Sequence, residues 1–325
     1  MSTLYLSNPA AVLSKSYEAF TVSVPDENGK SRRDSVPAQT INQVVILGSA
    51  QITTEALVYA LELGISVHYL TGFGRYLGSL MPAISRNGTL RLAQYELYND
   101  QTRRLEIVKR IVIAKIHNQA AVLYRHGVRD HGLLELKKKV ENQESIDGIR
   151  GIEGMAAKNY FSLFGGCIKG NWSFSGRSRR PPTDPVNAML SFAYGLLRSQ
   201  VSAAVHVVGL DPFVGFLHEP HHGQPALVLD LMENFRPLIA DNLVLSLLNR
   251  QQIKPEDFEN SLEAFRLNDR GRRVFLEEFD HKMKDEFKHP VFDYKCSYRR
   301  SIELQARLLS RSLQENIIFQ PLVLR

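Results

Sequence analysis

The chain has 325 residues, 44% of them hydrophobic, so it can bury a sizeable core and is not intrinsically disordered. Its 40 Lys and Arg exceed its 34 Asp and Glu, and the net charge of +6 mildly favours an anionic partner. Two cysteines are too few for a cysteine-rich zinc site, and no apolar run approaches the ~18 residues of a membrane span. We therefore expect a reduced, cytoplasmic chain of about two domains that does not associate with membranes.

Residues 1–95 have the sequence pattern of β-strands. Short segments rich in β-branched or aromatic residues alternate with turn sequences, as at residues 25–29. One helix is expected after Thr53, and it ends at Gly64 as helices commonly do. The predicted strands are TLYLS, AFTVSVP, NQVVILG and SVHYL. This part is predicted to be a β-rich N-terminal domain.

Residues 96–325 change to the helical period, with apolar side chains three and four residues apart. A long helix opens this region. Further helices are predicted near residues 150–164, 184–207, 237–250, 255–265, 271–286 and 297–313. The sequence therefore predicts an α+β fold, in which a β-rich N-terminal domain is joined to a larger all-helical C-terminal domain.

Three acidic residues and a histidine stand out in the helical region. Asp230 and Glu233 are three apart in an apolar run, so on a helix they share one face and repel each other unless a cation or protons intervene. Glu153 lies among small apolar residues, where an unpartnered carboxylate would be costly. Two carboxylates with the imidazole of His218 would suit manganese or magnesium better than zinc.

Each of these residues also has an ordinary interpretation. The two acids of the apolar run can face water at a helix end, and Glu153 can favour the positive end of its helix. A zinc cluster of His218, His221 and His222 is a further alternative, although no cysteine supports it.

A basic segment precedes the helix predicted at 184–207. Arg177, Arg179 and Arg180 come before a Pro-Pro turn, and Asp184 is placed to cap the helix. On that helix Asn187 and Tyr194 belong to one polar stripe. Such a stripe is typical of a buried hydrogen-bonded seam, but beside three arginines it could also contact a phosphate backbone.

Three segments together resemble a known family. They are IEGMAAKNYF, RSRRPPTDPVNAMLSFAYGLL and GLDPFVGFLHEPHHGQPALVLDLMENFRP. With the overall length, they are similar to the CRISPR-associated endonuclease and integrase that acquires new spacers. The block from Gly209 to Pro237 is the most specific part of the match.

The resemblance implies a catalytic and metal-binding triad of Glu153, His218 and Glu233, which would bind Mn²⁺ or Mg²⁺. Asp230 would be an assisting acid. Arg236 matches a basic family position that would neutralise phosphates. With Arg236, the DNA contacts implied or suggested are Arg177, Arg179, Arg180, Asn187 and Tyr194.

The resemblance also implies an activity and partners. The chain would insert spacer DNA into a CRISPR array by attack of a 3′-hydroxyl on a phosphodiester, in the cytoplasm of a prokaryote. Residues 1–95 would be a dimerisation domain and residues 96–325 the catalytic domain. Expected partners are double-stranded DNA, both protospacer and repeat, a second copy of the chain, and a small ferredoxin-like CRISPR-associated protein.

Two rival functions remain open on the sequence. A non-catalytic DNA-binding scaffold of the same fold would have no need of an intact Glu153, His218 and Glu233 set. A metallohydrolase of small molecules would have no need of the arginines near the acids.

Overall fold

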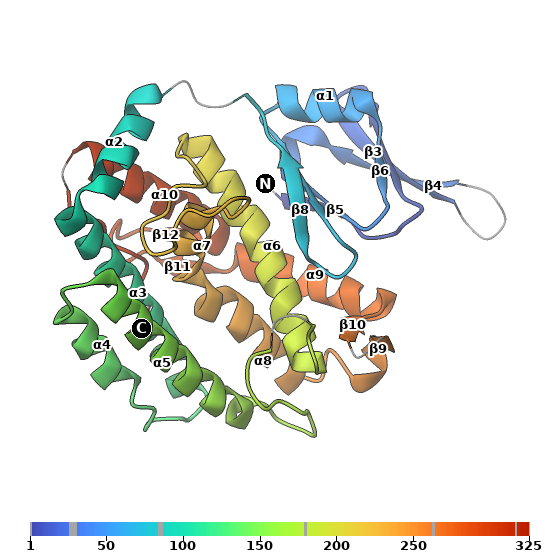
Figure 1. Cartoon of the computed structure of the whole chain (residues 1–325). Helices are drawn as coiled ribbons and strands as arrows, with labels where there is room; N and C mark the ends of the chain where they lie inside the picture. The colour runs from blue at the N-terminus through green and yellow to red at the C-terminus, as the bar shows by residue number, and fades with distance from the viewer. Residues whose placement is uncertain are drawn as a thin grey trace.

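The computed structural model describes residues 2–25, 31–83, 87–178, 181–261, 264–315 and 317–324. A strand-rich part lies at the upper right of Figure 1 and a larger helical part fills the rest of the view. The predicted α+β fold is confirmed. The last strand of the first part ends at Leu80 and the next helix begins at Gly88, so the predicted domain boundary at residue 95 falls within that helix. No helix of the described residues is long and apolar enough to cross a bilayer.

The strand-rich part contains two four-stranded sheets, with strand orders β1-β5-β7-β8 and β4-β3-β2-β6. In the first sheet β1, β5 and β7 are parallel and β8 is antiparallel to β7. All four predicted strands are present. The strands are β1 (Ser2–Leu6), β2 (Val12–Ser16), β3 (Ala19–Pro25), β4 (Ser31–Pro37), β5 (Ile41–Leu47), β6 (Gln51–Ile52), β7 (Ser66–Leu70) and β8 (Tyr76–Leu80).

Strand β5 is covered on both faces. Val44 and Ile46 belong to a core shared with the second sheet and helix α1 (Thr54–Glu62), whereas Val45 and Leu47 point into the core of the helical part. A strand buried on both sides has a continuous apolar sequence rather than an alternating one, as NQVVILG does. The first sheet therefore packs against the second sheet and α1 on one face, and against the helical part on the other.

The helical part contains nine α-helices in the described residues. They are α2 (Gly88–Asn99), α3 (Gln101–Arg125), α4 (Leu133–Glu141), α5 (Ile146–Phe164), α6 (Pro185–Val208), α7 (Ala226–Met232), α8 (Asn242–Asn249), α9 (Asp269–Lys284) and α10 (Tyr298–Gln314). The predicted long helix is two helices, because Asp100 ends α2 and its side chain accepts a hydrogen bond from Arg103 N at 3.0 Å, which caps α3.

The predicted helix at 255–265 is wrong. A short 3₁₀ turn at Pro255–Asp257 is followed by an antiparallel hairpin of β9 (Phe258–Ser261) and β10 (Ala264–Leu267). A second short hairpin pairs β11 (Glu286–Lys288) with β12 (Lys295–Ser297). Because β10 packs against α6, tertiary contacts override the local helical pattern.

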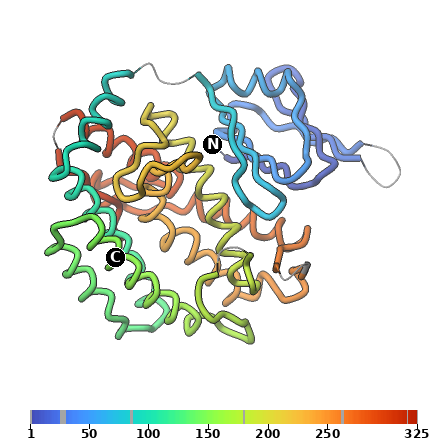
Figure 2. The backbone as a smooth tube through the Cα atoms, viewed as in Figure 1, coloured from blue at the N-terminus to red at the C-terminus, as the bar shows by residue number. Residues whose placement is uncertain are grey.

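Helix α6 joins the two parts. In Figure 2 its backbone runs between the sheet with β8 and the remaining helices. A Cβ on Gly195 of α6 would lie 1.8 Å from the carbonyl oxygen of Gly74 in the β7–β8 turn. Gly74 itself has φ +80° and a Cβ there would strike Phe192. Two glycines therefore permit the turn to touch the helix.

Candidate active site

Four elements bring charged side chains to one point. Lys115 comes from the middle of α3, Glu153 from α5, His218 from the loop between α6 and α7, and Glu233 from the residue that ends α7. The Lys115 ammonium forms an ion pair with Glu153 and another with Glu233, the latter at 2.6 Å. The two carboxylates therefore lie no further apart than two hydrogen-bond lengths, about 6 Å.

Glu233 is the most enclosed member, with 2% of its side chain exposed. Its Oε1 lies 2.9 Å from Arg236 Nη1 and 3.9 Å from His218 Nε2, while its Oε2 faces Lys115. Burial opposes ionisation, but Arg236 and then Lys115 outweigh it and lower the pKa of Glu233 to about 2. The group is therefore a carboxylate at neutral pH.

Asp230 holds the loop that carries His218. Its buried carboxylate accepts hydrogen bonds from the backbone N–H groups of Phe216, Leu217 and His218. The same carboxylate accepts from His218 Nδ1 at 2.7 Å. A proton on Nδ1 leaves the lone pair on Nε2, which faces Glu233, and this is the arrangement of a metal-ligating histidine with a supporting carboxylate.

A second group of hydrogen bonds, centred on Glu219 and called the Glu219 clamp below, holds the same loop. Glu219 accepts hydrogen bonds from Arg104 at 2.8 Å, Arg150 at 2.7 Å and Tyr98 at 2.9 Å. Arg150 also donates to the Leu217 carbonyl. Since Arg150 lies one turn before Glu153 on α5, this clamp fixes the helix of Glu153 relative to the loop of His218.

The side chains of Glu153, Glu233 and His218 are of the types that bind divalent cations. Two carboxylates and an imidazole Nε2 are ligands of Mn²⁺ and Mg²⁺ chemistry, and Lys115 already places one positive charge between the carboxylates. As they stand, the described residues contain no group of three or more His, Cys, Asp or Glu side chains arranged to hold a metal ion. The donor types therefore suit such an ion, while the ammonium of Lys115 lies between the two carboxylates. His221 and His222, the other members of the zinc alternative, are exposed in the following loop.

Beside the acids, two arginines share one aromatic ring. The guanidinium groups of Arg177 and Arg236 each lie 5.2 Å from the centre of the Tyr194 ring. The Tyr194 hydroxyl donates to Asp241 Oδ1 at 2.7 Å. Burial raises the pKa of Asp241 to about 6, although Tyr194 and the arginines favour its charged form.

The remaining predicted DNA contacts divide into two groups. Asn187 is fully buried, and its amide joins Arg177, Gly176 and Asp184, so it supports the basic segment from beneath. Asp184 caps α6 as expected. Arg179 and Arg180 lie outside the described residues.

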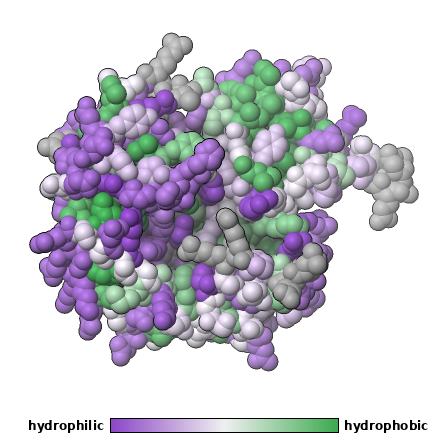
Figure 3. Space-filling model, in the orientation of Figure 1, coloured by the Kyte–Doolittle hydropathy of each residue, from purple (hydrophilic) through white to green (hydrophobic). Residues whose placement is uncertain are grey.

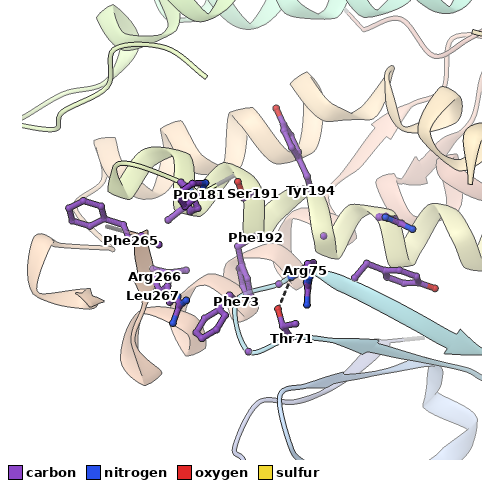
Figure 4. A pocket seen from close by; sticks show the side chains of 18 of the residues that line it. Thr71, Phe73, Arg75, Pro181, Ser191, Phe192, Tyr194, Phe265, Arg266 and Leu267 are labelled. Carbon is purple, nitrogen blue, oxygen red and sulfur yellow. Dashed lines mark hydrogen bonds between the residues drawn. The ribbon is translucent and has the colours of Figure 1, made fainter. Parts of the chain in front are cut away.

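A pocket of about 650 Å³ opens next to this stack. Figure 4 shows it between the β7–β8 turn with Phe73 and Arg75, helix α6 with Phe192 and Tyr194, and the segment around Arg266. The arginines that line it come from both parts of the chain and are Arg75, Arg177, Arg198, Arg236, Arg266 and Arg272. Such a surface suits a polyanion.

Sequence reasoning missed Lys115 and the Glu219 clamp. A signal for Lys115 exists, because it occurs on the apolar face of a predicted helix, three residues after Val112 and four after Ile111. A lysine on a core face needs a buried partner. The arginines of the clamp carry no such signal.

The fold and this site define a class of protein. In that class a strand-rich domain packs on a helical domain, which carries an acid–histidine cluster beside an arginine-lined pocket. The family model of the CRISPR associated protein Cas1 matches residues 4–281, and the chain belongs to this family.

Individual relatives agree with this assignment. The chain is 36% identical to the CRISPR-associated endonuclease Cas1 3 of Thermus thermophilus, over 96% of this chain and 94% of that protein. Among solved structures it is similar to a casposase bound to integration product, with a TM-score of 0.89 and 26% identity over 98% of this chain and 92% of that one. It also matches a chain of a Cas6-RT-Cas1–Cas2 complex, with a TM-score of 0.82 and 25% identity over 98% of this chain and 36% of the other.

Proposed function

We propose that the chain is a metal-dependent DNA endonuclease and integrase that inserts spacer DNA into a CRISPR array. The observation that carries this proposal is that Glu233 meets both other members from separate elements: it shares the Lys115 ammonium with Glu153 and lies 3.9 Å from His218 Nε2. Relatives that bear the name endonuclease, and the likeness to a casposase bound to integration product, support it.

The residues would divide the work as follows. Glu153, His218 and Glu233 would hold Mn²⁺ or Mg²⁺, which when bound polarises a scissile phosphate and assists the attacking 3′-hydroxyl. Asp230 keeps the His218 imidazole turned so that Nε2 faces the site. Arg236 contacts Glu233 and would neutralise phosphate charge beside it in the transesterification.

The arginine-lined pocket next to the acids is the proposed path of the DNA backbone. It is continuous with the Arg177–Tyr194–Arg236 stack, so a strand that follows it would bring its phosphates to Glu233. Protospacer and repeat duplexes are the proposed substrates. Binding of this kind is dominated by phosphate contacts and weakens with added salt.

A second copy of the chain is a proposed partner. The strand-rich part exposes large apolar side chains, among them Val58 of α1, Leu63 directly after α1, and Leu77 and Leu80 of β8. Figure 3 shows hydrophobic colour gathered over this part, whereas the helical part is mainly hydrophilic on that face. Apolar side chains gathered on one part of the surface favour an interface between copies.

A small ferredoxin-like CRISPR-associated protein is the other proposed partner, and the similar chain in a complex with Cas2 supports it. The proposed location is the cytoplasm of a prokaryote.

Strand transfer tests the function. The wild type would be incubated with short duplexes bearing 3′-hydroxyl ends, a supercoiled repeat plasmid, Mn²⁺ or Mg²⁺, and the small partner. Joined products should appear, and they should vanish in Glu153→Gln and His218→Ala while DNA binding persists. DNA binding without products in either metal would instead identify a non-catalytic scaffold.

A further inference from the structure

We propose that Lys115 is a built-in cation that assembles the acidic site before metal binds, and that a divalent ion must displace its ammonium. The inference rests on the proposed metal site of Glu153, His218 and Glu233. It assigns to Lys115 a positioning role toward that ion.

The position of Lys115 is unusual for a lysine. Only 8% of its side chain is exposed, and its neighbours one helical turn away, Ile111 and Gln119, are buried as well. Burial of an ammonium is costly unless it is paired. Here the ammonium is paired with two carboxylates, those of Glu233 and Glu153.

Both oxygens of Glu233 already face positive groups. Oε2 faces Lys115 at 2.6 Å, and Oε1 faces Arg236 at 2.9 Å. An ion ligated by Glu233 would therefore compete with one of them for the same carboxylate oxygen. Lys115 is the group that also contacts Glu153, so it occupies the space that an ion shared by the two acids would need.

The charges lead to the same conclusion. Lys115 and Arg236 together balance the two carboxylates of Glu153 and Glu233. Asp230, buried and hydrogen-bonded to His218, adds a third carboxylate. A divalent ion added beside both cations would still leave an excess of one positive charge in a largely buried site. Departure of the ammonium reduces this excess. Glu153 and His218 are 26% and 30% exposed, so an ion can reach the site from their side.

Metal binding by Lys115→Met tests the inference. This substitution keeps an apolar stem of similar length and removes the charge. Calorimetric titration of the full-length protein with Mn²⁺, without DNA, should show about tenfold tighter binding than in the wild type. In EDTA the variant should melt below the wild type, because two acids lose their cation, and Mn²⁺ should raise its melting temperature more.

Lys109→Met is the matched control. Lys109 lies on the same helix and pairs only with Glu106, at 3.7 Å, in the described residues. The Lys109→Met variant should bind Mn²⁺ as tightly as the wild type does. Equal or weaker Mn²⁺ binding by Lys115→Met would overturn the inference.

Crystals of the wild type soaked in Mn²⁺ give a second test that needs no variant. An anomalous peak at Glu153, His218 and Glu233 should coincide with loss of the contact between Lys115 and the two acids. A peak with the ammonium still between both carboxylates would overturn the displacement while leaving the proposed function intact. Absence of any peak at these residues would overturn the proposed metal site, and the inference with it.

Discussion

The Asp230 carboxylate contacts His218 twice. Its Oδ1 accepts from the imidazole Nδ1 at 2.7 Å and from the backbone N–H of the same residue at 2.9 Å. The other oxygen accepts from the N–H groups of Phe216 and Leu217. The Asp230 carboxylate is therefore saturated with donors from His218 and the two residues before it. Its role is to orient the histidine, which explains why two acids three residues apart occur in one apolar run.

Asp230→Asn should weaken metal binding without removing a ligand. The amide NH₂ would oppose a backbone N–H that now donates to a carboxylate oxygen, so the loop of His218 would shift. We expect Mn²⁺ affinity to fall by about 10- to 100-fold and the free energy of unfolding by roughly 1–3 kcal/mol. Calorimetry and urea denaturation measure the two effects. Glu106→Gln, which removes an exposed carboxylate from α3, is the control, and wild-type affinity in Asp230→Asn would contradict the orienting role.

Glu219→Gln should loosen the clamp in a pH-dependent way. Burial opposes ionisation of Glu219, but hydrogen bonds from Arg150, Tyr98 and Arg104 lower its pKa to about 2, from 4.5. A lowered acid pKa stabilises the fold above the unfolded value and loses this effect as pH falls. The free energy of unfolding of the wild type should therefore exceed that of the variant by on the order of 1 kcal/mol at pH 7, after allowance for solvent screening.

The gap should shrink between pH 4.5 and pH 2. Urea denaturation across this range checks it. A difference that stays constant on acidification would show that the ionised clamp contributes nothing.

Asp241→Asn should stabilise the protein at neutral pH. Burial raises the pKa of Asp241 from 3.8 to about 6, so its favourable contribution is complete below pH 3.8 and is lost as pH rises through 6. The asparagine can still accept from the Tyr194 hydroxyl. We expect the free energy of unfolding of Asp241→Asn to equal that of the wild type near pH 4, and to exceed it by on the order of 2 kcal/mol near pH 8. Thermal unfolding at both pH values measures it, and an equal effect at the two would contradict the assignment.

Arg75→Gln and Arg266→Gln should weaken DNA binding and lower its salt dependence. Both arginines line the pocket beside Tyr194. Each phosphate contact that is lost should reduce the slope of log affinity against log salt by about 0.9. Fluorescence anisotropy from 50 to 200 mM salt, roughly the range over which such slopes are read, gives the values. Arg32→Gln, on the exposed strand β4 and paired with Asp34, is the control. Unchanged slopes in both pocket variants would place the DNA elsewhere.

Much of the fold could be predicted from the sequence because local signals agreed with tertiary needs. Thr53 caps α1 and Asp184 caps α6, each through its side chain, as their positions indicated. The helix predicted at 255–265 failed because its apolar spacing also fits a hairpin. In the structure Asp257 is buried, pairs with Arg270, and ends the turn that leads into β9.

The site could be predicted only in part. Acids and a histidine in an apolar context suggested a shared cation. The structure brings Glu153 and Glu233 together on Lys115, with His218 beside Glu233. The sequence could not show which arginine meets Glu219, because that depends on how α3 and α5 cross the loop. Asn187 had two interpretations, and its burial favours the hydrogen-bonded seam.

Manganese calorimetry on the metal-free protein is the most direct test of a shared ion. The wild type should bind one Mn²⁺ per chain at Glu153, His218 and Glu233, and Glu153→Gln, His218→Ala and Glu233→Gln should each lose at least about 100-fold in affinity, since each removes one of three ligands. If all three variants bound Mn²⁺ as tightly as the wild type, these side chains would not share an ion, and the account of the site would be wrong.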